Sequence, residues 1–273
     1  MNFKNIIKRC WLFSFVVTLF SASCSKDNTI LDGETRILLI GNSFSEDALG
    51  NYFAELSKNA GKTFVVGILY IGGGSLEDHV KAMRENKTVK YREFNQDYTG
   101  KTLKLSLLSA LNRQDWTYVS VQQHSSKSGI YLSYHPYLNE LLSVIENNTR
   151  ANKIIHQTWS YEAPLIESLT EYDHSSFVMF DSIANVTDLL SKEYGLKVVP
   201  CGETIDHFRK LSDNMALTTD GKHLNRYGKY IAAYAWYAAI FRESLYNHMY
   251  YPQELDSSFV NKAKDAVVLS LKE

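Results

Sequence analysis

Short apolar runs alternate with amphipathic stretches along most of the chain. The runs have the length of buried strands and lie at residues 37–40, 62–71, 116–121, 153–161 (entering a loop) and 197–199. Apolar side chains recur at helical spacing around residues 49–56 and at 76–86, 105–112, 138–150, 175–194, 203–211, 225–246 and 256–271. Because strands and helices alternate, we predict an α/β fold: a three-layer α/β/α sandwich on a mostly parallel sheet of about five strands.

Residues 91–104 break this alternation. They alternate weakly between apolar and polar side chains around a Thr99–Gly100 turn, which predicts a β-hairpin. No internal repeat or low-complexity linker divides the sequence. A chain of 273 residues with 45% hydrophobic side chains can bury one good core, so we predict a single domain over residues 34–273.

The first 24 residues have the pattern of an export signal. Three cations, Lys4, Lys8 and Arg9, precede an apolar stretch at 11–20 that is short for a membrane span, and small residues then lead to Cys24. This ending resembles a bacterial lipobox, so we predict a lipoprotein signal peptide at 1–24, a lipid on Cys24 and a tether at 25–33. The protein would then be exported and held at the cell envelope, on the outer membrane or a periplasmic face. An ordinary signal peptide and an uncleaved anchor are the alternatives.

Charge and cysteine content narrow the range of partners and cofactors. The net charge is −1 with a pI near 6.7, and no basic cluster follows the N-terminus, so no nucleic acid partner is expected. With Cys10 and Cys24 inside the signal, Cys201 is the one cysteine of the domain and is interpreted as a core residue. The histidines are scattered and lack metal-ligand spacing, so we expect no metal and no other cofactor.

The candidate chemistry begins where the first strand ends. The segment 41–43 reads Gly-Asn-Ser and separates the strand at 37–40 from a helical pattern, which puts Ser43 at the carboxyl edge of the sheet. A serine hydroxyl at such a turn is well placed to act as a nucleophile. Asn42 and Ser43 are also preferred helix caps, so a purely structural role stays open at this point.

A second motif lies near the end of the domain. Asp220 and His223 are three residues apart in a turn that contains Gly221. At that spacing the carboxylate can orient the imidazole while the other ring nitrogen faces a distant serine. Together with Ser43, the pair is a candidate Ser-His-Asp triad.

These two motifs resemble those of the SGNH (GDSL-like) hydrolase superfamily of esterases and lipases, most closely its uncharacterised bacterial lipoprotein branch of the acetylesterase type. There a GDS-type block supplies the nucleophile and a DxxH block supplies the acid and the base. Here Asn42 stands where the commonest form has Asp. The resemblance implies an esterase with Ser43, His223 and Asp220 as catalytic residues.

The resemblance also implies an oxyanion hole. Its donors would be the N–H of Ser43, the N–H of a glycine in the run 72–74 and a side-chain amide after the strand at 116–121. We predict Gly73, with Gly72 and Gly74 as alternatives. We predict Gln122 as the amide, with Gln123 in reserve, because the usual Gly-x-Asn-Asp block is absent. A flexible turn with no ligand is the alternative for the glycines.

Further polar and aromatic residues near the predicted carboxyl edge are candidates for substrate contact or for a structural role. We predict substrate contacts at Asn42, Gly74, Gln123, Trp159 and Tyr161. The two aromatic residues follow a strand and would form a wall for a sugar or an acyl group, or else belong to the core and its rim. His124 is interpreted as a surface histidine, with substrate contact as the alternative.

The predicted function is hydrolysis of a carboxylic ester, with removal of acyl groups from an esterified carbohydrate or a similar small ester. The glycan substrate is an analogy based on export and on the aromatic residues. The alternative is an exported glycan-binding lipoprotein with an idle or lost active site.

Overall fold

A seven-stranded sheet is the centre of the fold in the computed structural model, which describes residues 33–213, 215–242 and 250–271. The strand order is β4-β3-β2-β1-β5-β6-β7. The pairs that β1 makes with β2 and β5, and that β6 makes with β5 and β7, are parallel. The strands are β1 (Thr35–Gly41), β2 (Phe64–Tyr70), β3 (Val89–Asn95), β4 (Gly100–Leu105), β5 (Tyr118–Val121), β6 (Asn152–His156) and β7 (Lys197–Val199).

The predicted hairpin belongs to this sheet. Strand β3 pairs antiparallel with β2, and β4 pairs antiparallel with β3 at the edge. The five predicted parallel strands are therefore extended by two more. The mostly parallel α/β architecture is confirmed.

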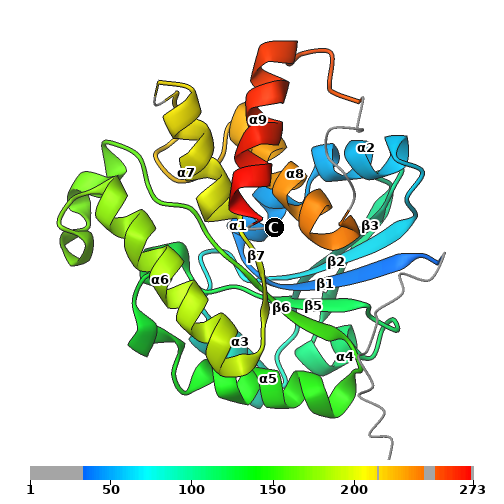
Figure 1. Cartoon of the computed structure of the whole chain (residues 1–273). Helices are drawn as coiled ribbons and strands as arrows, with labels where there is room; N and C mark the ends of the chain where they lie inside the picture. The colour runs from blue at the N-terminus through cyan, green and yellow to red at the C-terminus, as the bar shows by residue number, and fades with distance from the viewer. Residues whose placement is uncertain (1–32, 214, 243–249, 272–273) are drawn as a thin grey trace, which may run out of the picture. The chain divides into compact units, whose positions relative to one another are not determined.

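Helices cover both faces of the sheet (Figure 1). On one face lie α1 (Ser43–Ala48), α2 (Asn51–Asn59), α7 (Cys201–Leu211), α8 (Arg226–Phe241) and α9 (Ser257–Ser270). On the other lie α3 (Leu76–Arg84), α4 (Leu107–Leu111) and α5 (Tyr137–Asn148). Helix α6 (Ser176–Tyr194) contributes to the cores on both faces. Short 3-10 turns lie at Ser125–Lys127, Tyr131–Tyr134, Leu165–Ser168 and Thr170–Tyr172.

The central strand β1 shows why two cores form. Its side chains alternate between the two faces, so Ile37 and Leu39 pack with α8 while Leu38 and Ile40 pack on the side of α5. All four are fully buried. A continuous apolar run on a central parallel strand follows from helices on both faces.

Two helix boundaries differ from the prediction. The helix predicted around 49–56 corresponds to α2, which begins at Asn51, and a separate helix α1 precedes it, with Leu49 and Gly50 between the two. Helix α8 ends at Phe241, because Arg242 takes a left-handed conformation (φ 51°) that stops it before residue 246. The remaining predicted residues of that helix lie outside the described part of the chain.

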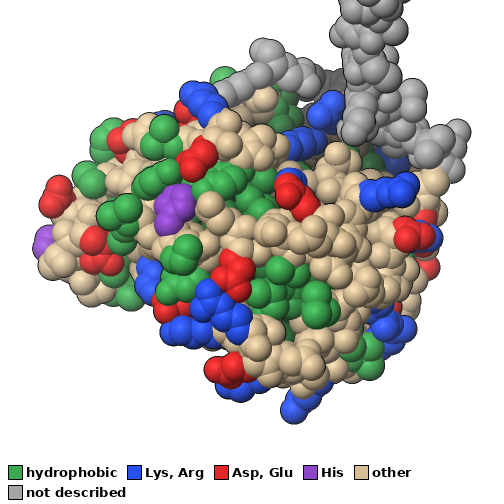
Figure 2. Space-filling view, turned by 90° about the horizontal axis from the view of Figure 1, so that it is seen from below, with side chains coloured by type: hydrophobic (Ala, Val, Ile, Leu, Met, Phe, Trp, Pro, Cys, Tyr) green, Lys and Arg blue, Asp and Glu red, His purple; other side chains and the backbone are tan. Residues whose placement is uncertain are grey.

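The predicted signal peptide at 1–24, Cys24 and nearly all of the tether at 25–33 lie outside the described residues. Within the described ranges, no helix has the length and apolar character needed to cross a membrane. Figure 2 shows one face of the domain, where side chains of both charges are scattered among hydrophobic and uncharged ones.

Candidate active site

The turn between β1 and α1 shows which of Asn42 and Ser43 caps the helix. Asn42 is the helix cap: its Oδ1 accepts the Phe44 N–H at 3.0 Å, and its Nδ2 donates to the Gly74 carbonyl at 2.8 Å. Ser43 is the first residue of α1 and is half-buried, so its hydroxyl is not used as the cap. The cap and the candidate nucleophile are therefore adjacent residues with distinct functions.

Ser43, His223 and Asp220 form a continuous chain of side-chain contacts across 180 residues of sequence. Ser43 Oγ lies 3.1 Å from His223 Nε2, and His223 Nδ1 lies 2.6 Å from Asp220 Oδ2. An Nδ1–H donated to the carboxylate leaves the Nε2 lone pair to accept the serine proton. The structure thus brings together the three residues that the two motifs predict.

Asp220 is kept ionised by its own turn. Partial burial acts to raise the pKa of this carboxyl, but the His223 N–H at 2.7 Å, the His223 ring and the Lys222 N–H lower the pKa of Asp220 to about 2. The side chain is 47% exposed. The carboxylate is therefore negative at neutral pH and can stabilise a positive imidazolium.

The histidine turn is attached to the domain at several points. Glu162 accepts the N–H groups of Leu217 at 2.9 Å and Thr218 at 3.2 Å, and its own N–H donates to the Gly221 carbonyl at 2.7 Å. Gly221 has φ +89°, a conformation that favours glycine. Arg209 binds the same carboxylate at 2.8 Å.

Helix α1 holds the same turn from the side of the serine. Asp47 Oδ2 accepts the N–H of Leu224 at 2.9 Å, and its Oδ1 lies 3.2 Å from Lys229 Nζ. Because Asp47 lies on the helix that Ser43 begins, this contact fixes the serine relative to His223. Its position four residues after Ser43, one helical turn away, is the signal in the sequence that could have identified it. Glu162 has no comparable signal.

Within the glycine loop, the structure distinguishes Gly73 from Gly74. The Gly74 N–H donates to the Ile71 carbonyl at 2.9 Å and the residue is buried, so both its donor role and its predicted substrate contact are wrong. Gly73 is exposed with φ +61°, and within the described residues its N–H has no hydrogen-bond acceptor. Gly73 stays the predicted oxyanion donor.

The prediction for Gln122 is contradicted by its contacts. The side chain is buried, its Nε2 donates to Asn42 Oδ1 at 2.7 Å and to the Gln123 carbonyl at 3.2 Å, and its Oε1 accepts from Ser45 Oγ at 2.7 Å. Both amide hydrogens are used inside the protein. Gln122 therefore supports the turn around Asn42 and Ser43 and is not a free oxyanion donor.

Gln123 and Asn42 are likewise structural. Gln123 is buried, its Oε1 accepts the N–H of Leu76 at 3.1 Å and that of His124 at 2.8 Å, and its Nε2 donates to the Ser133 carbonyl. Asn42 is 2% exposed, its Oδ1 accepts two hydrogen bonds and its Nδ2 donates to the Gly74 carbonyl. The predicted substrate contacts at these two residues are wrong.

The predicted aromatic wall belongs to the core. Trp159 is fully buried, stacks on Phe44 with ring centroids 4.1 Å apart, and donates from Nε1 to the Lys222 carbonyl at 2.7 Å. Tyr161 is 3% exposed and its hydroxyl lies 2.6 Å from Ser125 Oγ. Trp159 supports the histidine turn through this bond, and both side chains belong to the core, which corrects their assignment as substrate contacts.

Gly41 has a steric role at the same turn. A Cβ on this residue would lie 2.2 Å from Ser45 Oγ and 3.0 Å from Gln122 Oε1. Its carbonyl accepts from the buried ring of His79, whose Nε2 is 3.0 Å away. Strand β1 can therefore approach its neighbours closely at the point where the serine turn begins.

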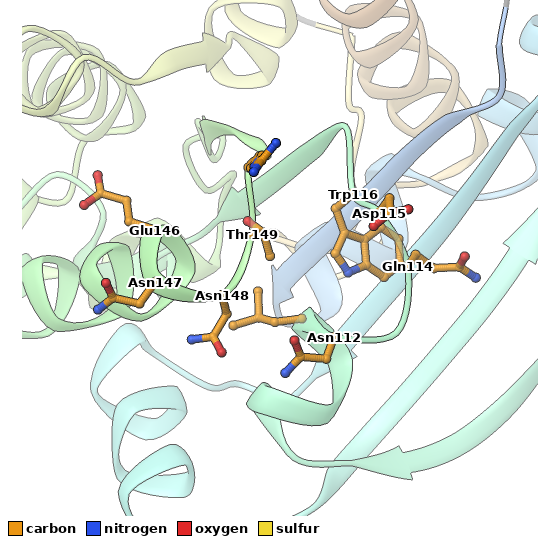
Figure 3. Close-up of a pocket in the computed structure, with 10 residues that line it drawn as sticks. Asn112, Gln114, Asp115, Trp116, Glu146, Asn147, Asn148 and Thr149 are labelled. Carbon is orange, nitrogen blue, oxygen red and sulfur yellow. The ribbon is translucent and has the colours of Figure 1, made fainter.

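A cavity of about 660 Å³ lies at the opposite end of the sheet. It is formed by the segment before β5 and the end of α5, and includes Asn112, Asp115, Glu146 and Asn148 (Figure 3). The amides of Asn112 and Asn148 donate to carbonyls of their own helices. In the described part of the chain, no three His, Cys, Asp or Glu side chains are arranged to hold a metal ion.

Comparison with known proteins identifies the family. The profile of the DUF4886 family, described as a domain of unknown function, matches residues 36–269. The chain belongs to the DUF4886 family. A crystal structure of a DUF4886 family protein from Bacteroides uniformis is 31% identical, with a TM-score of 0.83 over 88% of this chain and 97% of that chain.

More distant structures show the fold of this DUF4886 chain. A candidate SGNH hydrolase from Slackia heliotrinireducens is 20% identical, with a TM-score of 0.54 over 76% of this chain and 99% of that chain. An acetyl xylan esterase is 12% identical, with a TM-score of 0.52 over 75% and 99%. The fold is that of the SGNH hydrolases, which confirms the resemblance at this level. No curated protein matches the chain.

Proposed function

We propose that this DUF4886 protein is a serine ester hydrolase whose nucleophile is Ser43. The observation that carries the proposal is the chain of contacts from Ser43 Oγ through the His223 ring to Asp220, with distances of 3.1 and 2.6 Å. A cap would need neither the histidine nor the carboxylate. The SGNH hydrolase fold adds a scaffold on which such chemistry is known.

In the first half of the reaction, His223 Nε2 takes the Ser43 proton while Oγ adds to the ester carbonyl. The carbonyl π electrons move to oxygen, where the N–H groups of Ser43 and Gly73 would receive the negative charge. Each such donor contributes on the order of 3 kcal/mol to the transition state. Asp220 stabilises the imidazolium, which then protonates the leaving alcohol as the carbon–oxygen bond breaks.

In the second half, the acyl group on Ser43 is released by water. His223 takes a proton from the water, whose oxygen adds to the acyl carbon, and then returns a proton to Ser43 Oγ as that bond breaks. The products are a carboxylic acid and the free enzyme. We propose an O-acyl carbohydrate as substrate, since one structure of the same fold is an acetyl xylan esterase.

The test is hydrolysis of p-nitrophenyl acetate by the purified protein and by Ser43→Ala. The variant should lose at least about 1,000-fold in kcat, because the nucleophile is removed. A fluorophosphonate probe should label the wild type at Ser43. Equal turnover by both proteins, with no labelling, would instead favour a glycan-binding protein.

We also propose that the protein is exported and lipid-anchored through Cys24. Metabolic labelling with a palmitate analogue should mark the wild type and not Cys24→Ala. Label retained in the variant would contradict the proposal.

A further inference from the structure

With Gln122 excluded, the oxyanion needs another donor at the same edge of the sheet. The strand register shows where to look, because Ile40 of β1 pairs with Leu69 of β2 and with Val121 of β5. Ser43 lies three residues beyond Ile40, and His124 lies three residues beyond Val121. Ser43 and His124 therefore follow neighbouring parallel strands, each three residues after the same pair of hydrogen-bonded strand positions.

The contacts of His124 determine where its ring proton lies. Its Nδ1 accepts the backbone N–H of Ser126 at 3.2 Å and lies 2.9 Å from Ser126 Oγ. A ring nitrogen that accepts an N–H carries its lone pair there, so the neutral ring has its proton on Nε2. Burial, together with the charges of Lys127 and Lys222, lowers the pKa of His124 and keeps the ring neutral at pH 7.

The backbone of His124 is connected to the glycine loop through Gln123. Its N–H donates to Gln123 Oε1, which also receives the N–H of Leu76 just beyond the glycine loop. The ring is half-buried, and among the described residues its Nε2 has no hydrogen-bond acceptor. A fixed donor is thus left unused at the edge of the sheet where Ser43 also lies.

We propose that His124 Nε2–H donates a hydrogen bond to the carbonyl oxygen of the bound ester as that oxygen becomes negative. His124 keeps its proton throughout, and the bonds made and broken are those of the serine mechanism. The inference rests on the proposed esterase function. It makes His124 a catalytic residue that stands in for the side-chain amide predicted at Gln122.

Two substitutions distinguish hydrogen-bond donation to the substrate from the structural role of the His124 side chain. In His124→Ser the hydroxyl can still accept the Ser126 N–H but is too short to reach a substrate, whereas His124→Asn keeps an acceptor and adds an amide N–H. With p-nitrophenyl acetate, we expect His124→Ser to lose about 100-fold in kcat with KM changed less than threefold. His124→Asn should recover at least about tenfold of that loss.

Matched measurements guard against a purely structural effect. His207→Ala on α7 is the histidine control and should keep wild-type kcat. Thermal unfolding should give melting temperatures for the two His124 variants within a few degrees of the wild type. Nitrogen NMR of the wild type at pH 7 should show a neutral His124 ring with its proton on Nε2.

The outcomes distinguish this inference from the proposed function. If Ser43→Ala is inactive but His124→Ser keeps full kcat, the esterase stands and the role of His124 is overturned. A proton on Nδ1, or equal loss in the Asn and Ser variants, overturns it as well. If the wild type is no more active than Ser43→Ala and is not labelled, both proposals fail.

Discussion

The two turns that form the site are built in opposite ways. The turn around Asn42 and Ser43 is held from within by buried amides, chiefly those of Asn42 and Gln122. The turn around Asp220 and His223 is partly exposed. It is held by side chains that are distant in the sequence, including Glu162 and Trp159. Damage to the first turn should therefore appear as lost stability, and damage to the second mainly as lost activity.

The largest effect on stability is expected from Asn42→Asp. Its carboxylate can still accept from Phe44 and Gln122, but an oxygen would face the Gly74 carbonyl where an N–H now donates at 2.8 Å. A buried carboxylate oxygen that faces a carbonyl without a donor should cost about 2–4 kcal/mol of unfolding free energy. Urea unfolding measures it, with exposed Asn139→Asp as control. A loss below about 0.5 kcal/mol would contradict this account.

Acid should weaken the serine turn next. Burial lowers the pKa of His79 to about 4, below the 6.5 of an unfolded histidine, although its bond to Gly41 acts in the opposite direction. The unfolded chain thus binds more protons, so stability present above pH 6.5 is lost as pH falls towards 4, by about 2 kcal/mol from this group. Urea unfolding at pH 7 and 4.5 should show a smaller decrease for His79→Gln than for the wild type. Equal decreases would remove His79 as a cause.

Glu162→Gln tests the histidine turn. The neutral amide weakens the bonds to Leu217, Thr218 and Arg209 but keeps the side-chain volume. We expect about 1–2 kcal/mol of lost stability but about a tenfold decrease in kcat, because His223 is no longer held at Ser43. Exposed Glu171→Gln is the control. Unchanged kcat together with a large stability loss would reverse the contrast between the two turns.

The smallest effect should follow Trp159→Phe. Phenylalanine can keep the stack on Phe44 but loses the N–H that donates to the Lys222 carbonyl. The loss of one such bond corresponds to about 1 kcal/mol, so kcat should fall about threefold to tenfold. Esterase assays and melting temperatures measure both consequences. An unchanged kcat would contradict the idea that this bond positions the histidine turn.

The same contrast explains what sequence reasoning could reach. Ser43, Asp220 and His223 lie in two short motifs where residue type and spacing already carry the chemistry, and the structure brings them together. The direction in which an amide side chain points cannot be predicted from residue type and spacing alone. Gln122 follows a strand as an oxyanion donor would, but Asn42 and Ser45, far away in sequence, turn its side chain inward.

The fold shows the same limit. Alternating strands and helices predicted the parallel sheet, since that pattern is local. The sequence also predicts the hairpin at 91–104. Its pairing with β2 is not predicted, because a weak alternation of apolar and polar residues does not indicate which strand will be the partner. Trp159 and Tyr161 illustrate the point for single side chains, since burial of an aromatic residue after a strand depends on the helices packed above it.

The close packing around Gly41 has a consequence for mutational scans of this family. Even alanine there would drive a methyl group into Ser45 and Gln122, so an inactive Gly41→Ala variant would report crowding, not the loss of a backbone donor. A simultaneous Ser45→Gly substitution would remove the nearest side chain and make room for the methyl group. The first residue of the Gly-Asn-Ser motif thus has to be small for a steric reason that is independent of the role of Ser43.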